Sequence, residues 1–211
     1  MKALMDIIAK ALGVLLYPLF VPTYGMLLFC YAFTSITSMP LAWCLVAIIG
    51  TFLLTCILPI TAIWILIRKG VVSDLQIENS SERTMPYIYT ILGFSFWCYL
   101  LISILHAPIF MCFVAIGATI AITLIAVINR WWKISAHLSG FGGLVGSIFA
   151  YHLAMSIEPS WSNICLWLCA SLVLMYARVY VKAHTPAQVC AGWLMGMTCT
   201  FIPYCIFVYA A

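Results

Sequence analysis

Residues 41–67 read LAWCLVAIIGTFLLTCILPITAIWILI, an apolar run without a single charged side chain. A helix needs ~20 consecutive apolar residues to cross the hydrocarbon core of a membrane. This run is long enough to cross, and Arg68 and Lys69 follow it directly. It therefore predicts a transmembrane helix.

The composition extends this conclusion to the whole chain of 211 residues. Hydrophobic residues make up 66% of the sequence and charged residues 7%, and the mean hydropathy is +1.18. Soluble domains carry about 25% charged residues, so the sequence predicts an integral membrane protein. The ten cysteines are scattered without metal-ligand spacing, and we interpret them as small packing residues.

Apolar runs separated by short polar connections predict an all-α, polytopic membrane helix bundle with about 6–7 transmembrane helices. The bundle forms a single transmembrane domain over residues 1–211. The expected spans lie near 12–34, 41–67, 86–105, 108–128, 137–157, 163–181 and 187–209. Because Pro18 and Pro22 interrupt the first run, residues 3–16 can instead form a short amphipathic helix at the membrane interface.

The charged residues are distributed unevenly between the two expected faces. Successive spans alternate in direction, so the N-terminus and the connections near 68–85, 129–136 and 182–186 share one face. All nine basic residues lie on or near that face: Lys2, Lys10, Arg68, Lys69, Arg83, Arg130, Lys133, Arg178 and Lys182. The positive-inside rule is one explanation and an anion-binding site is another, and the two are compatible.

Three polar segments are expected to meet at the basic face. They are SSERTMP (80–86), KISAHLSG (133–140) and ARVYVKAHTPAQ (177–188), and two spans separate each from the next. Together they contribute imidazoles that can transfer protons or attack, and cations that can hold a multiply charged anion such as phosphate. The residues are Arg83, Lys133, His137, Arg178 and His184.

The last of these segments also predicts a helix start. Thr185, Pro186 and Gln188 have the spacing of an N-cap, a first helical residue and a capping-box partner. His184 would then precede a helix N-terminus, where free N–H groups and the helix dipole favour an anion.

Small residues predict close packing of the helices that begin near the two histidines. They are Ala136, Gly140, Gly143, Ser147 and Ala150 on one helix, and Gly192 and Gly196 on the other.

The three segments together resemble the signature of the type-2 phosphatidic acid phosphatase superfamily, over roughly residues 70–200. That signature has a first motif ending in Arg-x-x-Pro or Arg-Pro, a second of Pro-Ser-Gly-His, and a third of Ser-Arg, five residues, His, three residues, Asp. Arg178 and His184 have the third-motif spacing, and KISAH keeps the serine and histidine of the second. The first motif is retained only as ERTMP.

This resemblance implies a mechanism. His184 would be the nucleophile that forms a phosphohistidine, and His137 would protonate the leaving group and later activate water. Phosphoryl oxygens would be bound by Arg83, Arg178, Lys133 and the backbone near Ser135. The resemblance implies no metal and no cofactor.

The sequence departs from the superfamily at two positions. Gln188 stands where the third motif has Asp, and its amide oxygen can accept from the imidazole without supplying a charge. Branches acting on dolichyl diphosphate or glucose 6-phosphate are similar in having Gln there. Gln76 stands where the first motif has Lys.

The resemblance implies hydrolysis of a lipid phosphomonoester or diphosphate, such as a polyprenyl diphosphate, a phosphatidate, phosphatidylglycerol phosphate or a sphingoid phosphate. The alternative is a catalytically weak or inactive lipid-phosphate binder or transporter, and a bis-histidine haem or quinone protein is disfavoured. The expected partners are membrane lipids and not nucleic acid, and no oligomeric state follows from the sequence. The expected location is the cell (inner) membrane. The charge bias favours a cytoplasmic site, whereas characterised superfamily members often face the periplasm or lumen.

Overall fold

The computed structural model describes residues 2–37, 39–74 and 82–210. Every regular element in these ranges is helical. In chain order they are α1 (Lys2–Leu15), α2 (Val21–Thr37), α3 (Leu41–Phe52), the π-helix η1 (Leu53–Ile57), α4 (Leu58–Arg68), α5 (Thr84–Ser103), α6 (Ile109–Ile128), α7 (Ala136–Met155), α8 (Trp161–Tyr180) and α9 (Pro186–Ala210).

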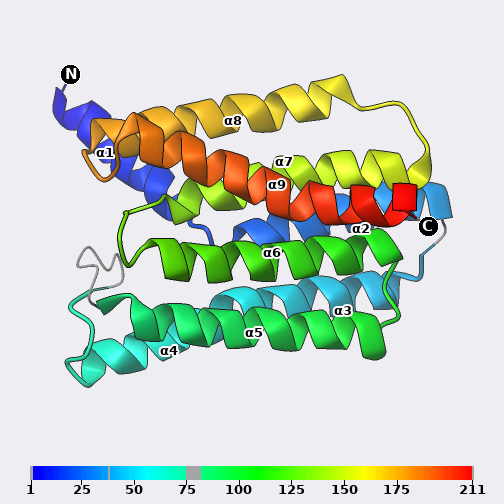
Figure 1. Ribbon diagram of the computed structural model, residues 1–211, viewed down its shortest axis with the longest axis horizontal. Helices are drawn as coiled ribbons and strands as arrows, with labels where there is room; N and C mark the ends of the chain where they lie inside the picture. The colour runs from blue at the N-terminus through cyan, green and yellow to red at the C-terminus, as the bar shows by residue number, and fades with distance from the viewer. Residues whose placement is uncertain (1, 38, 75–81, 211) are drawn as a thin grey trace.

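The long helices lie side by side as one bundle (Figure 1). In the described part of the chain, 6 helices are long and apolar enough to cross a membrane, with α3, η1 and α4 acting as one continuous helix, Leu41–Arg68. Their ends fall within two residues of the expected spans. The prediction of an all-α, multi-pass membrane bundle is confirmed.

The expected span at 12–34 is wrong. The chain leaves the helix after Leu15 and begins α2 at Val21, with Pro18 between them. Proline has no N–H and cannot continue the hydrogen-bond ladder, whereas Pro22 falls in the first turn of α2, where no such bond is required. The short N-terminal helix that the sequence offered as an alternative is α1, and it packs against α8.

The closest helix pair is α7 and α9, which lie along each other in Figure 1. A Cβ at Gly196 would overlap the carbonyl oxygen of Ser139, and one at Gly142 would overlap the carbonyl of Trp193. The two backbones therefore touch, as the small residues predict. The α7 contact uses Gly142 rather than Gly140, whose Cβ would meet Val21 of α2.

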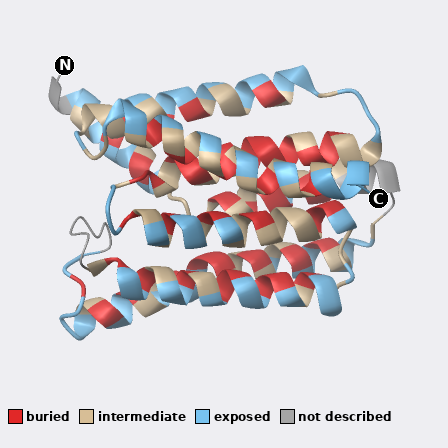
Figure 2. Ribbon diagram, viewed as in Figure 1, coloured by how far each residue is buried: buried red, intermediate tan, exposed pale blue. Residues whose placement is uncertain are grey.

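Helix α7 is the most enclosed span, with 67% of its apolar 18-residue window buried, and Figure 2 shows its red, buried residues inside the bundle. The chain reversals that carry basic residues gather at one end, on the left of Figure 1. The basic residues of this end are Lys10, Arg68, Lys69, Arg83, Arg130, Lys133, Arg178 and Lys182. The expected clustering of positive charge is confirmed, and we call this the basic end.

Candidate functional site: a cationic cavity at the basic end

A cavity of about 1000 Å³ opens among the helices. The predicted site residues that line it are Arg83, Lys133, His137, Arg178 and His184. Lys10 and Lys182 line it as well. The structure thus brings together side chains from α1, α7 and α8 and from the connections before α5, α7 and α9.

A turn at the end of α8 fixes the spacing between Arg178 and His184. The N–H groups of Ala183 and His184 both donate to the Arg178 carbonyl, at 3.1 and 3.3 Å. Lys182 adopts a left-handed conformation with φ 57°, and this is the Schellman pattern of helix termination. The turn reverses the chain and leaves His184 two residues before α9.

The His184 ring is oriented by a backbone carbonyl. Its Nδ1 lies 3.1 Å from the Lys133 carbonyl oxygen. Because a carbonyl only accepts, Nδ1 carries the proton, and Nε2 of the neutral ring keeps its lone pair.

Burial is the main reason that the pKa of His184 falls to about 4, and the charge of Arg178 lowers this pKa further. The hydrogen bond to the Lys133 carbonyl raises this pKa, whereas the positive charge of Lys133 lowers it. A side-chain hydrogen bond with Gln188 raises the pKa as well, by the smallest amount. His184 is therefore neutral at pH 7.

Gln188 belongs to the start of α9. Its Oε1 accepts from the Thr185 N–H at 3.0 Å, and Thr185 Oγ1 accepts from the Gln188 N–H at 3.4 Å. This confirms the predicted capping box. Gln188 does not line the cavity. The Lys133 carbonyl accepts from Nδ1 of His184, and a side-chain hydrogen bond with Gln188 also raises the pKa of His184.

Ser135 joins the starts of α7 and α9. It is fully buried as the N-cap of α7, where its hydroxyl accepts from the Leu138 N–H at 3.5 Å. Its own N–H donates to the Gln188 carbonyl at 3.3 Å, and it does not line the cavity. The Ser135 N–H thus joins the first turns of α7 and α9, and the neighbouring residues Ile134 and Ala136 line the cavity.

His137 lies in the first turn of α7, under the end of α1. Its Nε2 donates to the Gly13 carbonyl at 3.1 Å, which leaves Nδ1 as the acceptor of the neutral ring. The ring of Tyr17 packs edge-on against it, with centroids 5.5 Å apart. The sequence did not reveal these contacts, since α1 and α7 are distant in the chain and neither Gly13 nor Tyr17 belongs to a motif.

Tyr17 is a cavity residue that the sequence reasoning missed. Burial, and after it Cys56, raise the pKa of its phenol above 10, while Arg178 opposes this. Tyr17 therefore keeps its proton at neutral pH and is a hydrogen-bond donor beside the cations.

Asn129 is the second missed residue. Arg83 is only 8% exposed, and its Nη1 donates to Asn129 Oδ1 at 2.9 Å. The Asn129 amide donates in turn to the Tyr87 hydroxyl at 3.2 Å and to the Ile125 carbonyl at 3.0 Å. The amide oxygen of Asn129 therefore fixes the orientation of the Arg83 guanidinium. A polar residue ending an otherwise apolar span was the available signal.

The other histidines lie away from this cavity. His152 accepts from the Ser160 N–H at 3.2 Å, near the end of α7 opposite His137, and His106 is exposed in the turn between α5 and α6. Within residues 2–37, 39–74 and 82–210, no three His, Cys, Asp or Glu side chains are grouped to hold a metal ion. Gln76 lies outside the described residues.

Comparisons with protein-family models, with curated protein sequences and with solved structures found no match for this chain.

Proposed function

We propose that this protein is a metal-independent membrane phosphatase that hydrolyses a lipid phosphomonoester or diphosphate through a phosphohistidine on His184. The observation that carries the proposal is the state of His184. Its ring is neutral, its Nδ1–H is held by the Lys133 carbonyl, and it lines a cavity shared with Arg83, Arg178 and His137. A neutral, oriented imidazole among cations suits nucleophilic attack on a phosphoryl group.

The proposed reaction has two steps. The Nε2 lone pair of His184 forms a bond to phosphorus as the bond from phosphorus to the leaving oxygen breaks. His137 must first bind a second proton at Nδ1, and it gives that proton to the leaving oxygen. Water then attacks the phosphohistidine, His137 takes a proton from the water, and the P–N bond breaks to release phosphate. The cations Arg83, Lys133 and Arg178 stabilise the charge on the phosphoryl oxygens in both steps.

A second candidate is a lipid-phosphate binder or transporter that does not turn over. Two observations favour it: Gln188 supplies no carboxylate, and its amide oxygen is engaged with Thr185. A carboxylate beside His184 would stabilise the positive charge that the ring acquires on phosphorylation, and a backbone carbonyl does this less strongly.

The test is phosphate release by purified protein from a panel of lipid phosphates and diphosphates. The wild type is compared with His184→Ala and His137→Ala, and with His106→Asn as a control for an exposed histidine outside the cavity. We expect both cavity variants to lose at least 100-fold in rate, in line with the loss of a general acid–base or nucleophilic group, and the control to keep its activity. Unchanged release by His184→Ala would overturn the mechanism. Binding without release on every substrate would favour the second candidate.

We also propose that the protein resides in the cell membrane with its basic end in the cytoplasm. Some of the cations of this end are distant from the cavity: Arg68, Lys69 and Arg130 do not line it. They serve no anion there, so the positive-inside rule explains them directly.

A further inference from the structure

The cavity extends far beyond the cationic site. Along α5 and its N-cap Arg83, the cavity is lined from Arg83 and Pro86 at the basic end to Trp97 and Leu101 near the opposite end. At 1.5 Å per residue, the distance from Thr84 to Leu101 is about 26 Å. This nearly equals the ~30 Å thickness of a bilayer's hydrocarbon core.

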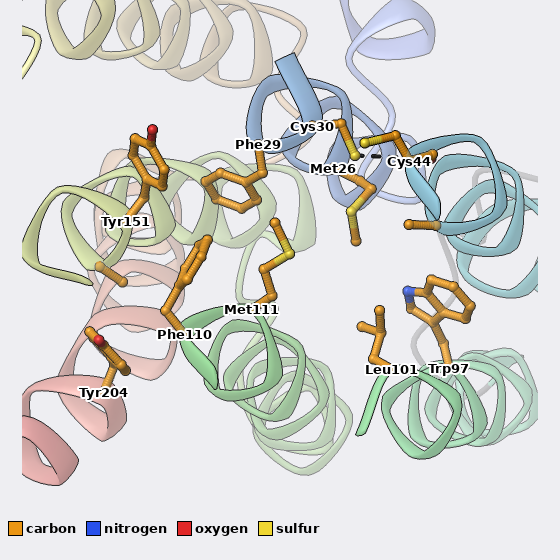
Figure 3. Packing of buried hydrophobic residues seen from close by; sticks show 12 residues of the cluster. Met26, Phe29, Cys30, Cys44, Trp97, Leu101, Phe110, Met111, Tyr151 and Tyr204 are labelled. Atoms are coloured by element: carbon orange, nitrogen blue, oxygen red, sulfur yellow. Dashed lines mark hydrogen bonds between the residues drawn. The ribbon is translucent and has the colours of Figure 1, made fainter. Parts of the chain in front are cut away.

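The charged residues that line the cavity all belong to its basic end. The deeper lining is apolar and comes from α2, α5 and α6: Met26, Phe29, Phe94, Leu101, Met111 and Val114. Figure 3 shows the side chains of Met26, Met111, Leu101 and Trp97 pointing toward one another from these three helices. The cavity therefore has a cationic mouth and a long apolar interior.

Hydroxyl groups along the cavity direct their protons to helix backbones. Thr51 donates to the Ala47 carbonyl at 2.7 Å and Thr55 to the Thr51 carbonyl at 2.8 Å. Thr90 and Ser147 likewise donate to carbonyls of their own helices, at 2.8 and 2.7 Å. These walls thus offer their methyl and methylene groups to an occupant more than their hydrogen-bond donors, which favours a hydrocarbon.

Aromatic rings close the far end. Phe29 packs edge-on against Phe110 with centroids 5.4 Å apart, and Phe110 contacts Tyr151 at 5.7 Å (Figure 3). Phe110 is 1% exposed and does not line the cavity. Phe29, Leu101 and Met111 therefore form a floor to the cavity.

We propose that this interior binds the aliphatic chain of a lipid phosphate inside the bundle, from the cationic mouth to the floor, so that the protein selects its ligand by chain length. The inference deepens the proposed function and rests on it for the phosphate headgroup. The ligand class is a phosphorylated lipid with a chain of about 26 Å, close to the depth of the cavity. A chain that reaches the floor buries more apolar surface than a shorter one, and affinity rises about fourfold per buried methylene.

The experiment measures binding, so it does not depend on turnover. The probes are monoalkyl phosphates of increasing chain length, with inorganic phosphate as the headgroup alone, and the readouts are the thermal shift and Kd in detergent. All variants are made in His184→Ala, which prevents hydrolysis under the proposed mechanism. In this background we expect affinity to rise with each methylene until the chain reaches the floor, and then to level off.

Two substitutions change the usable depth, and one serves as a matched control. Ala118→Phe on α6 introduces a ring into the cavity lining, seven residues from Met111 and therefore about 10 Å above the floor. With this ring in place, affinity should stop rising at a chain length about 10 Å shorter than in the protein without it. Met111→Ala lowers the floor and should extend the rise to longer chains. Ile120→Phe places the same ring on the outer side of α6, where the residue is 43% exposed, and should change nothing.

The outcomes separate this inference from the proposed function. Affinity that ignores chain length, or a length profile unchanged by Ala118→Phe and Met111→Ala, would overturn the inference, because the chain would then lie outside the bundle. If Ala118→Phe does not fold, Met111→Ala decides alone. A length-dependent profile in the His184→Ala background, together with no phosphate release by the wild type on any substrate, would retain the tail site and reject the phosphatase.

Discussion

At the scale of single residues, the main feature is that His184 is held by a peptide carbonyl. A carboxylate in that place would favour the imidazolium and raise the ring's pKa. The Lys133 carbonyl fixes the tautomer with a weaker effect, so burial and the Arg178 charge prevail and the pKa falls to about 4. The neutral form of His184 is consequently the resting form above about pH 4.

This pKa predicts how stability depends on pH. In the unfolded chain His184 has its usual pKa of 6.5, against about 4 in the folded protein. Between these values the unfolded state binds a proton that the folded state does not, so the free energy of unfolding decreases as the pH falls through this window. His184→Gln removes the contribution. The melting temperature of the wild type in detergent should fall more steeply from pH 7 to pH 4 than that of the variant, and parallel profiles would contradict the assignment.

Some parts of the site could be predicted from the sequence and others could not. Counting spans places Arg83, His137 and His184 at the same end of the bundle, because two crossings return the chain to one face. The Lys133 carbonyl could not be predicted, since a backbone acceptor leaves no mark on residue type. The roles of Tyr17 and Asn129 could not be predicted either, because they depend on the packing of α1 and on the orientation of the Arg83 side chain.

At the scale of helices, the α7–α9 pair positions both histidines. Ser135 and Gln188 connect the first turns of the two helices by a backbone hydrogen bond, and the glycines hold the helices together beyond that point. His137 and His184 thus sit at the N-terminal ends of one rigid pair. A change in the packing of this pair would move one histidine relative to the other.

Gly196→Ala tests this packing. Its Cβ would overlap the Ser139 carbonyl, a backbone group that cannot move alone, and overpacking of this kind costs about 1–3 kcal/mol. The matched control is Gly143→Ala, whose Cβ would lie 3.4 Å from Thr200 Cγ2, an ordinary contact. Both variants gain the same helix propensity, so their difference reports packing. Thermal denaturation in detergent should show Gly196→Ala to be the less stable, and equal stability would refute the close approach.

The helices themselves were predicted well where long apolar runs were uninterrupted. The prediction of one span over 12–34 was wrong because the hydropathy is continuous through Pro18, whereas the helix is interrupted there. Hydropathy reports whether a segment can lie in lipid, and proline reports whether it can remain one helix. The break matters for the site, because it lets α1 fold back over His137.

At the scale of the whole molecule, the two ends of the bundle differ in charge. The basic end carries the cations, and the opposite end exposes Glu158 and His106. By the positive-inside rule, this asymmetry favours the proposed orientation with the basic end in the cytoplasm. In that orientation the proposed phosphate ligand would reach the cavity mouth from the cytoplasm.

Single cysteines at opposite ends would test the orientation. Ser73→Cys and Ser162→Cys both replace exposed serines, in a background whose ten native cysteines are changed to alanine. A membrane-impermeant maleimide applied to intact cells should label position 162, and position 73 only after permeabilisation. The reverse pattern would place the basic end, and the cavity mouth with it, outside the cytoplasm.

The hydrogen bond from His184 to the Lys133 carbonyl has a consequence for genetics. Every residue at position 133 supplies a carbonyl, so no substitution there can delete the acceptor. A saturation mutational scan would detect only the effects of losing the charge and the aliphatic part of the Lys133 side chain. It would therefore underestimate the structural importance of this position. Insertions or deletions between Trp132 and Ser135, which displace the peptide group itself, would be far less tolerated than any exchange of side chains.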